Sequence, residues 1–120
     1  MVEQKAVQSY RDLIIWQRGM SLAKRVYELP AVFPGEEKYG LIAQLRRAAV
    51  SVPSNIAEGQ ARRSTAEFRQ FLSHALGSLA EVDTQIRLGM LLGFCTEVQA
   101  EPVLSEIAEL RAMIPLCETS

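Results

Sequence analysis

Arginine is concentrated in the middle of the sequence. Residues 41–70 hold five arginines against two acidic residues, Glu58 and Glu67. Guanidinium groups bind phosphate and carboxylate oxygens through paired hydrogen bonds, so one interpretation is a site for an anion or a nucleic acid. The other interpretation is a set of ordinary solvated helix faces. The candidate binding residues are Arg46, Arg47, Arg62, Arg63, Asn55 and Glu58.

Residue types that could support catalysis are sparse and scattered. His74 is the single histidine, and its spacing of seven residues from Glu67 and Glu81 places it in a polar helix stripe. Cys95 and Cys117 lack a metal-ligand spacing, so we expect small buried hydrophobic side chains rather than a disulfide. No nucleotide-binding fingerprint occurs. We therefore expect no enzyme, no catalytic residue, no metal and no cofactor.

The spacing of the apolar residues predicts four helices. These residues recur with a helical period almost throughout, and no alternating strand pattern is present. Short connections make neighbouring helices antiparallel. The expected fold class is all-α, an antiparallel up-down-up-down four-helix bundle that forms a single domain. The expected helices span residues 12–32, 37–60, 64–93 and, from either 97 or 101, to 116; the domain covers 1–120, with 1–9 as a disordered tail.

Several helix ends carry recognisable signals. Ser64 with Glu67 matches a capping box, and Ser9 with Asp12 resembles an acidic one. Gly93 is the expected C-cap of the third helix. These signals set the boundaries of the first and third helices more firmly than those of the fourth.

Proline and glycine interrupt the second helix. Pro53 removes the amide that would bond to Ala49 and crowds that carbonyl. Because Ile56 beyond it keeps the apolar register, we expect a kink near Pro53 rather than an end. Gly59 is then expected in the left-handed position after the last helical residue. Pro102 is expected in the first turn of the fourth helix.

The second helix is apolar on two sides. One stripe suits the bundle core, and on a wheel of about 100° per residue a second flank lies beside it. A monomer exposing both would tend to aggregate, so we expect the flank to be a subunit interface. The alternative is that the first helix covers it, using its own apolar face of Leu13, Trp16, Met20, Ala23 and Tyr27. The interface candidates are Ile42, Ala49, Val50, Pro53 and Ala57.

One charge of the third helix falls close to its apolar seam. Asp83 lies about 40° from the centre of that seam. A carboxylate in such a position needs a partner. Arg87, four residues later, and Arg46, across the bundle, are the two candidates for a buried charge pair.

Charge and hydropathy indicate where in the cell the protein is located. The net charge is −1, so the chain as a whole has no strong attraction to nucleic acid or anionic lipid. No apolar run reaches the roughly 18–20 residues that span a bilayer. The first twelve residues, MVEQKAVQSYRD, have no apolar signal region. We expect a cytoplasmic protein without a membrane partner.

Long stretches of the sequence resemble a known family. The segments QLRRAAVSVPSNIAEG and RRSTAEF, with YRDLIIWQRGMSLAKRVYEL before them, are similar to the 23S rRNA intervening sequence proteins, also called S23-type proteins. The resemblance covers residues 10–94. It implies a four-helix bundle that assembles into a ring-like homopentamer and has no attached enzymatic activity. Accessory proteins of diversity-generating retroelements, a distantly similar group, form basic pentameric barrels that bind nucleic acid.

Two functions are consistent with these features. The first is a non-enzymatic, self-assembling bundle that acts as a scaffold or binds a partner. The second is an accessory protein that binds RNA or DNA through an arginine-rich ring in the oligomer. In the ring, the arginines either hold an anion or are neutralised by Glu58.

Overall fold

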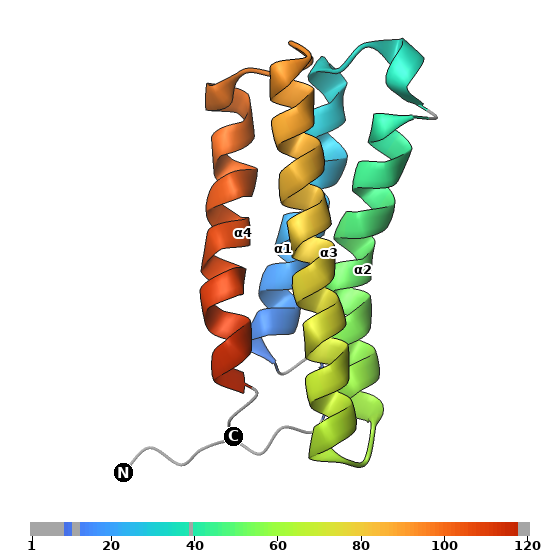
Figure 1. The fold of residues 1–120 in the computed structure, drawn as a ribbon, viewed down its shortest axis with the longest axis vertical. Helices are drawn as coiled ribbons and strands as arrows, with labels where there is room; N and C mark the ends of the chain where they lie inside the picture. Colours follow the sequence, from blue (N-terminus) through green and yellow to red (C-terminus); the bar gives the residue numbers. More distant parts are fainter. Residues whose placement is uncertain (1–8, 11–12, 39, 118–120) are drawn as a thin grey trace.

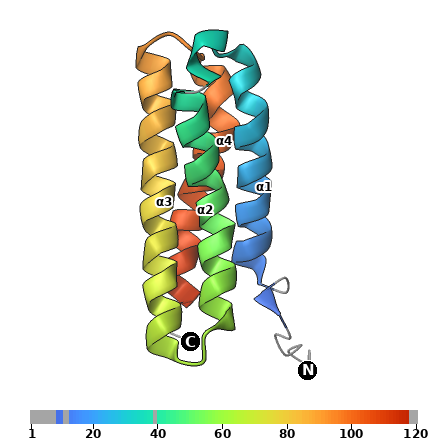
Figure 2. The same ribbon diagram turned by 90° about the vertical axis from the view of Figure 1, so that its right-hand side faces the viewer.

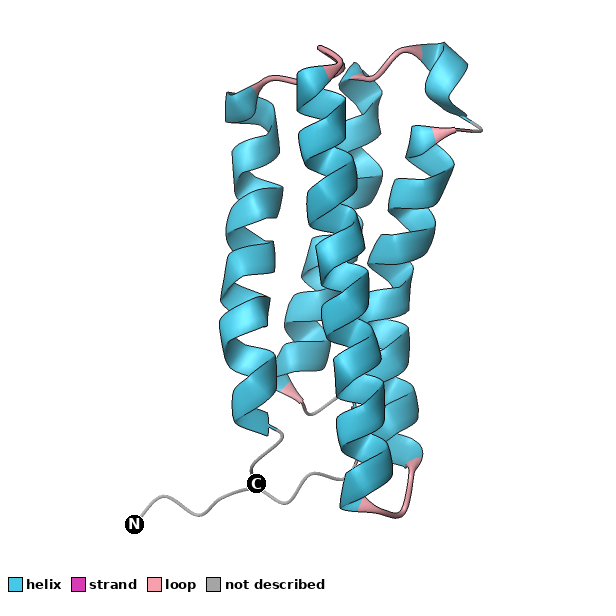
Figure 3. Cartoon of the chain, in the orientation of Figure 1, coloured by secondary structure: helices cyan, strands magenta, loops and turns pink. Residues whose placement is uncertain are grey.

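The computed structural model describes residues 9–10, 13–38 and 40–117, most of them in four long helices (Figure 1; Figure 3). This part of the chain contains no strand. Successive helices run in opposite directions (Figure 2), so the all-α, up-down-up-down four-helix bundle is confirmed. The elements are α1 (Ile14–Glu28), η2 (Leu29–Val32), η3 (Gly35–Lys38), α2 (Leu41–Ala61), α3 (Thr65–Leu91) and α4 (Glu97–Cys117), with η2 and η3 as 3-10 turns.

The core stripes of α2, α3 and α4 follow the 3.6-residue period of their sequences. Each helix buries branched and small side chains at spacings of three and four residues, which places them on one face. These faces meet along the bundle axis, so the core is continuous. Its fully buried members include Leu45, Val52 and Ile56 of α2, Leu72, Leu79 and Ile86 of α3, and Ile107, Leu110 and Ile114 of α4.

The first helix is rotated relative to the sequence-based expectation. Its buried residues are Ile15, Gly19, Leu22 and Val26, whereas Leu13, Trp16 and Ala23 of the predicted face are only partly buried against the core. Within that predicted face, Met20 and Tyr27 are each 48% exposed. The helix is apolar on two adjacent sides, and the side with Gly19 turns inward because it allows close approach to α2. The bulkier side is therefore left along the surface.

The capping signals are confirmed for α3. Ser64 Oγ accepts a hydrogen bond from the amide of Glu67 at 3.1 Å and donates to its carboxylate at 3.1 Å. At the other end, Gly93 has φ +78°, the left-handed value that glycine adopts without strain. The amide of Phe94 donates to the carbonyl of Gly89 at 2.8 Å, as in a Schellman motif.

The expectation for Gly59 is wrong. Gly59 lies inside α2, which continues to Ala61, and the only positive-φ glycine among the described residues is Gly93. A Cβ at Gly59 would come 2.9 Å from the Cβ of Phe71. The glycine therefore serves the close approach of α2 and α3 rather than a turn.

The start of α4, left open by the sequence, is set by a second capping box. The amide of Thr96 donates to the side chain of Gln99 at 2.9 Å, and the amide of Gln99 donates to Thr96 Oγ1 at 3.2 Å. The helix thus begins at Glu97. Pro102 consequently lies in the second turn of α4, not in the first as expected.

Neither the kink predicted at Pro53 nor the capping box predicted before the first helix is confirmed. Pro53 lies within α2, which is helical throughout, and the kink predicted there is not confirmed. Asp12, half of the predicted first capping box, is outside the described residues, as are residues 1–8 of the predicted tail. The residue that precedes α1 is Leu13, which makes no side-chain capping hydrogen bond.

Candidate functional site

The structure does not gather the four candidate arginines into one cluster. Arg46 and Arg47 lie near the start of α2, whereas Arg62 and Arg63 follow its end. At a rise of about 1.5 Å per residue, the two pairs are roughly 24 Å apart along the helix axis. Within one chain, the four arginines therefore form two separate pairs, one near each end of α2.

Two of these arginines are already engaged within the chain. The Arg46 guanidinium lies 4.7 Å from the centre of the Tyr27 ring, and it donates to the Tyr27 carbonyl at 3.3 Å. Arg62 lies 4.8 Å from the Phe71 ring centre and 3.7 Å from the Glu58 carboxylate. These contacts fix α1 against α2 and the end of α2 against α3. Glu58 thus neutralises Arg62.

The pairing of Asp83 is resolved in favour of the local partner. Arg87 Nε donates to Asp83 Oδ2 at 2.9 Å, and the Asp83 side chain is 21% exposed. This hydrogen bond raises the pKa of Arg87 above its ordinary value. Arg46, the other candidate, contacts Tyr27 instead. The predicted buried pair is therefore a partly exposed pair on one helix.

Asn55 belongs to a polar contact between α2 and α3. Its side-chain amide donates to the Ser51 carbonyl at 2.8 Å and to Ser51 Oγ at 3.2 Å. Ser51 Oγ also hydrogen-bonds to Ser78 Oγ, a buried hydroxyl of α3. The Ser51–Ser78 hydrogen bond thus links the two helices, whereas the Asn55 side chain bonds within α2.

An apolar groove runs along the surface between α1 and α2. Its volume is about 350 Å³, and we name it the α1–α2 groove. The Tyr10 and Trp16 rings meet edge to face at one end, with their centres 5.3 Å apart. Such a concentration of aromatic side chains and methionine is typical of the centre of protein interfaces. The lining residues are Tyr10, Trp16, Met20, Ala23, Val50, Pro53, Ser54 and Ala57.

The predicted interface flank of α2 is narrower than expected. Ile42 and Ala49 are buried within the bundle, and Pro53 is also buried, although it lines the floor of the α1–α2 groove. Pro53 is covered because Gly19 brings α1 close: a Cβ on Gly19 would stand 3.4 Å from that of Pro53. Val50, at 42% exposure, and the half-buried Ala57 remain accessible. The exposed apolar surface continues from them onto α1.

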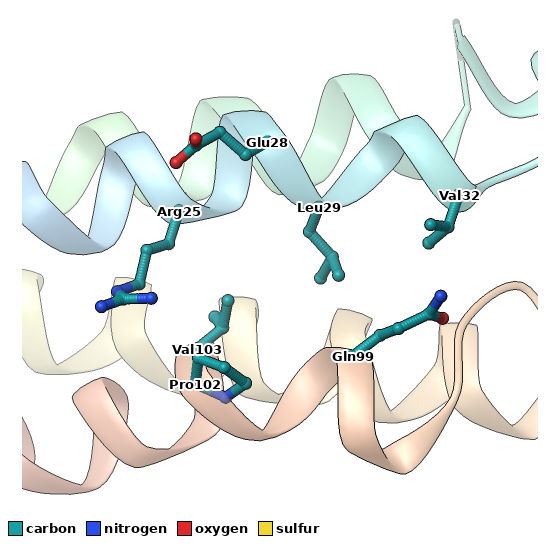
Figure 4. Close-up of a pocket in the computed structure, with 7 residues that line it drawn as sticks. All are labelled: Arg25, Glu28, Leu29, Val32, Gln99, Pro102 and Val103. Atoms are coloured by element: carbon teal, nitrogen blue, oxygen red, sulfur yellow. The ribbon is translucent and has the colours of Figure 1, made fainter.

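A smaller groove lies between the end of α1 and the start of α4. Its volume is about 300 Å³, and Figure 4 shows Leu29 and Val32 facing Gln99 and Val103 across it. Arg25 extends away from these residues, consistent with its ion pair to Glu106 at 3.3 Å. The side chains that face each other are mostly apolar, so this groove offers little chemistry for selecting a ligand.

The groups most relevant to catalysis do not converge. In the described part of the chain, no three histidine, cysteine or acidic side chains are placed to hold a metal ion. His74 is exposed, with its ring 5.7 Å from that of Phe71. Burial raises the pKa of the Cys95 thiol, which disfavours a reactive thiolate. No helix in the described ranges is long and apolar enough to cross a membrane.

The fold is a four-helix bundle with grooves on its surface. The family model for the 23S rRNA-intervening sequence protein matches residues 11–115, and the chain belongs to this family. The resemblance inferred from the sequence is thus confirmed. Neither the family description nor the structural neighbour below names an enzymatic activity.

One solved structure is similar over nearly the whole bundle. It is a protein with unknown function from the S23 ribosomal protein family of Bacteroides thetaiotaomicron, and its TM-score is 0.81. The identity is 21%, with 89% of this chain and 100% of that chain covered. At that identity the likeness shows the shared fold. A comparison with curated proteins gives no match.

Proposed function

We propose that this protein is a non-enzymatic scaffold that assembles with copies of itself through the α1–α2 groove. The observation that carries the proposal is the exposure of Met20 and Val50 beside Trp16, in a groove lined almost entirely by apolar side chains. Burial of such a surface is the main favourable term in protein association. A second copy is the occupant that a ring-forming family implies.

The low net charge supports self-association. At a net charge of −1, copies of the chain repel one another only weakly. Closed symmetric assemblies are the usual outcome when a chain recognises itself. The family resemblance implies a ring of five copies. In such a ring, the grooves would be repeated around the symmetry axis and the bundle would present several identical outer faces to a partner.

Introducing a charge into the α1–α2 groove tests the proposal. Met20→Glu and Val50→Glu place a carboxylate in the interface, so each is expected to convert the oligomer into a monomer at micromolar concentration. The matched control is Leu91→Glu, because Leu91 is 85% exposed and does not line the groove. Mass would be measured by sedimentation, with circular dichroism to verify folding. Folded groove variants that keep the parent mass would refute the proposal.

Nucleic-acid binding is the second candidate function. It is favoured by Arg47 and Arg63, which are exposed and form no ion pair within the described residues. Binding of labelled structured RNA should then weaken steeply between about 50 and 200 mM salt. The double variant Arg47→Gln/Arg63→Gln should lower both the affinity and the salt dependence. Absence of RNA binding at low salt would eliminate this candidate.

A further inference from the structure

Another apolar surface lies where the start of α1 meets the end of α4. It surrounds an open depression of about 400 Å³, and we name it the α1–α4 patch. Two of its large aliphatic side chains protrude into solvent, since Ile14 is 62% exposed and Leu116 is 73% exposed. The residues that line the patch are Leu13, Ile14, Ile15, Met113, Leu116 and Cys117.

The α1–α4 patch and the α1–α2 groove have the same electrostatic character. Among the described residues, neither lining contains a charged side chain. By contrast, the groove between the end of α1 and the start of α4 contains Arg25 and Glu28. Burial of a charged group without a partner costs free energy, whereas burial of apolar surface is favourable. The two uncharged surfaces are therefore suited to burial against each other.

The two surfaces are also complementary in shape. The α1–α2 groove has the small side chains of Ala23, Ser54 and Ala57 in its walls, which leave room for a larger side chain between the helices. Ile14 and Leu116 supply protruding aliphatic side chains of that kind. Large side chains that enter a recess lined by small ones give the close packing found at the centre of protein interfaces.

The α1–α4 patch and the α1–α2 groove lie on different sides of α1. This helix packs against both α2 and α4. Ile14 of the patch lies about 160° around α1 from Trp16 of the groove, at 100° per residue. One copy can therefore use both surfaces at the same time. The start of α1, the end of α2 with Ala57 and the end of α4 all lie at the bottom of Figure 1, so the two surfaces are at the same end of the bundle.

The alternative pairings of the α1–α2 groove fit the structure less well. Pairing with the same groove of a second copy would leave Ile14 and Leu116 in water. Leu91 and Val98 are also exposed, at 85% and 83%, but they lie at the opposite end of the bundle (Figure 1). Pairing the groove with them would displace each copy along the bundle axis, which builds an open filament rather than a closed assembly.

We propose that the α1–α4 patch of one copy binds in the α1–α2 groove of the next copy, so that the chain associates head to tail. This inference rests on the self-assembly proposed above and adds the surface that the groove binds. Each copy contributes one patch and binds another, so both apolar surfaces are covered in every copy. A head-to-tail contact between surfaces at the same level closes into a ring when the rotation between copies allows it.

A charge in the patch tests the pairing separately from the groove itself. Leu116→Glu lies outside the α1–α2 groove, and we expect it to convert the oligomer into a monomer, as Met20→Glu does. The matched control is Val98→Glu, because Val98 is on the same helix and similarly exposed. Sedimentation measures the mass, and circular dichroism verifies folding. A folded Leu116→Glu oligomer of parent mass, beside a monomeric Met20→Glu, would overturn the head-to-tail pairing and leave self-assembly through the groove intact.

Cross-linking identifies the two surfaces that meet. In a Cys95→Ala background, Ser54→Cys introduces a thiol into the groove, and the native Cys117 lies in the patch. A short bismaleimide should join the two positions between copies into a ladder that extends beyond the dimer, and Cys117→Ala should abolish that ladder. Cross-links that stop at the dimer and persist in Cys117→Ala would overturn the pairing. An oligomer of parent mass without cross-links would overturn it too, whereas a monomeric parent chain would overturn the proposed self-assembly itself.

Discussion

Gly59 of α2 lies directly against Phe71 of α3, so closely that a Cβ on the glycine would come 2.9 Å from the phenylalanine Cβ. Real Cβ atoms do not approach so closely, and the atom in the way belongs to the rigid base of the side chain. This contact sets the spacing of α2 and α3. It also brings Arg62 over the Phe71 ring.

Gly59→Ala should destabilise the bundle despite alanine's better helix propensity. Overpacking costs about 1–3 kcal/mol, against a propensity gain of about 1 kcal/mol. We expect a net loss of up to about 2 kcal/mol in the free energy of unfolding. The control is Gly77→Ala, because Gly77 has no neighbour within 4 Å and should gain about 0.5–1 kcal/mol. Urea denaturation at one fixed protein concentration measures both; equal effects would contradict this account.

Removing Arg25 should harm the bundle more than removing Arg18. Arg25 lies 3.3 Å from Glu106, whose side chain is only 15% exposed and also accepts from Ser21 Oγ at 2.7 Å. Arg25→Met leaves that carboxylate with the hydroxyl alone, at a cost of about 1–3 kcal/mol. Arg18 pairs with the half-exposed Glu109, and exposed pairs contribute less than about 1 kcal/mol. Thermal unfolding that gives the same loss for Arg18→Met and Arg25→Met would show the ranking to be wrong.

Cys95 should make the bundle less stable in alkali. Its pKa is raised by burial, so the folded state favours the neutral thiol. The resulting stability is fully present below the ordinary thiol pKa of about 8.5, and is lost as the pH rises through the folded value. Unfolding measured from pH 7 to 10 should show this loss in the parent and in Cys117→Ala. Cys95→Ala should lack this component, and an identical pH profile would refute the assignment.

The two thiols should also differ in reactivity. Cys95 is buried, whereas Cys117 is half-buried near the end of α4. Reaction with a thiol reagent requires the thiolate, so at pH 8 we expect Cys117 to react roughly tenfold faster or more. The reaction should therefore have a fast phase and a slow phase. The single-cysteine variants Cys95→Ala and Cys117→Ala show which thiol accounts for each phase.

The sequence predicted the bundle well because periodic apolar spacing determines which faces of α2, α3 and α4 are buried. It failed for α1, where Trp16 and Met20 form an equally regular stripe beside Ile15 and Leu22. Periodicity alone does not choose between two apolar sides of one helix. The choice depends on Gly19 meeting Pro53, a contact between residues 34 positions apart.

The candidate sites were harder to predict. Arg46 and Arg47 are adjacent in the sequence, but Arg46 contacts Tyr27 whereas Arg47 lines a polar surface groove between α2 and α3. Arg62 is likewise engaged within the chain, because it pairs with the Glu58 carboxylate and lies over the Phe71 ring. The capping box of Thr96 and Gln99 was readable in the sequence and would have fixed the start of α4.

Trp16 provides the most direct test of the central claim. It is the single tryptophan of the chain and lines the α1–α2 groove, so its emission reports whether that groove is covered. Light scattering and fluorescence would be measured together over a dilution series. We expect a mass that is a multiple of 13.4 kDa, with a red shift of the emission as the assembly dissociates. A 13.4 kDa monomer at every concentration, or dissociation without a spectral change, would contradict self-assembly through this groove.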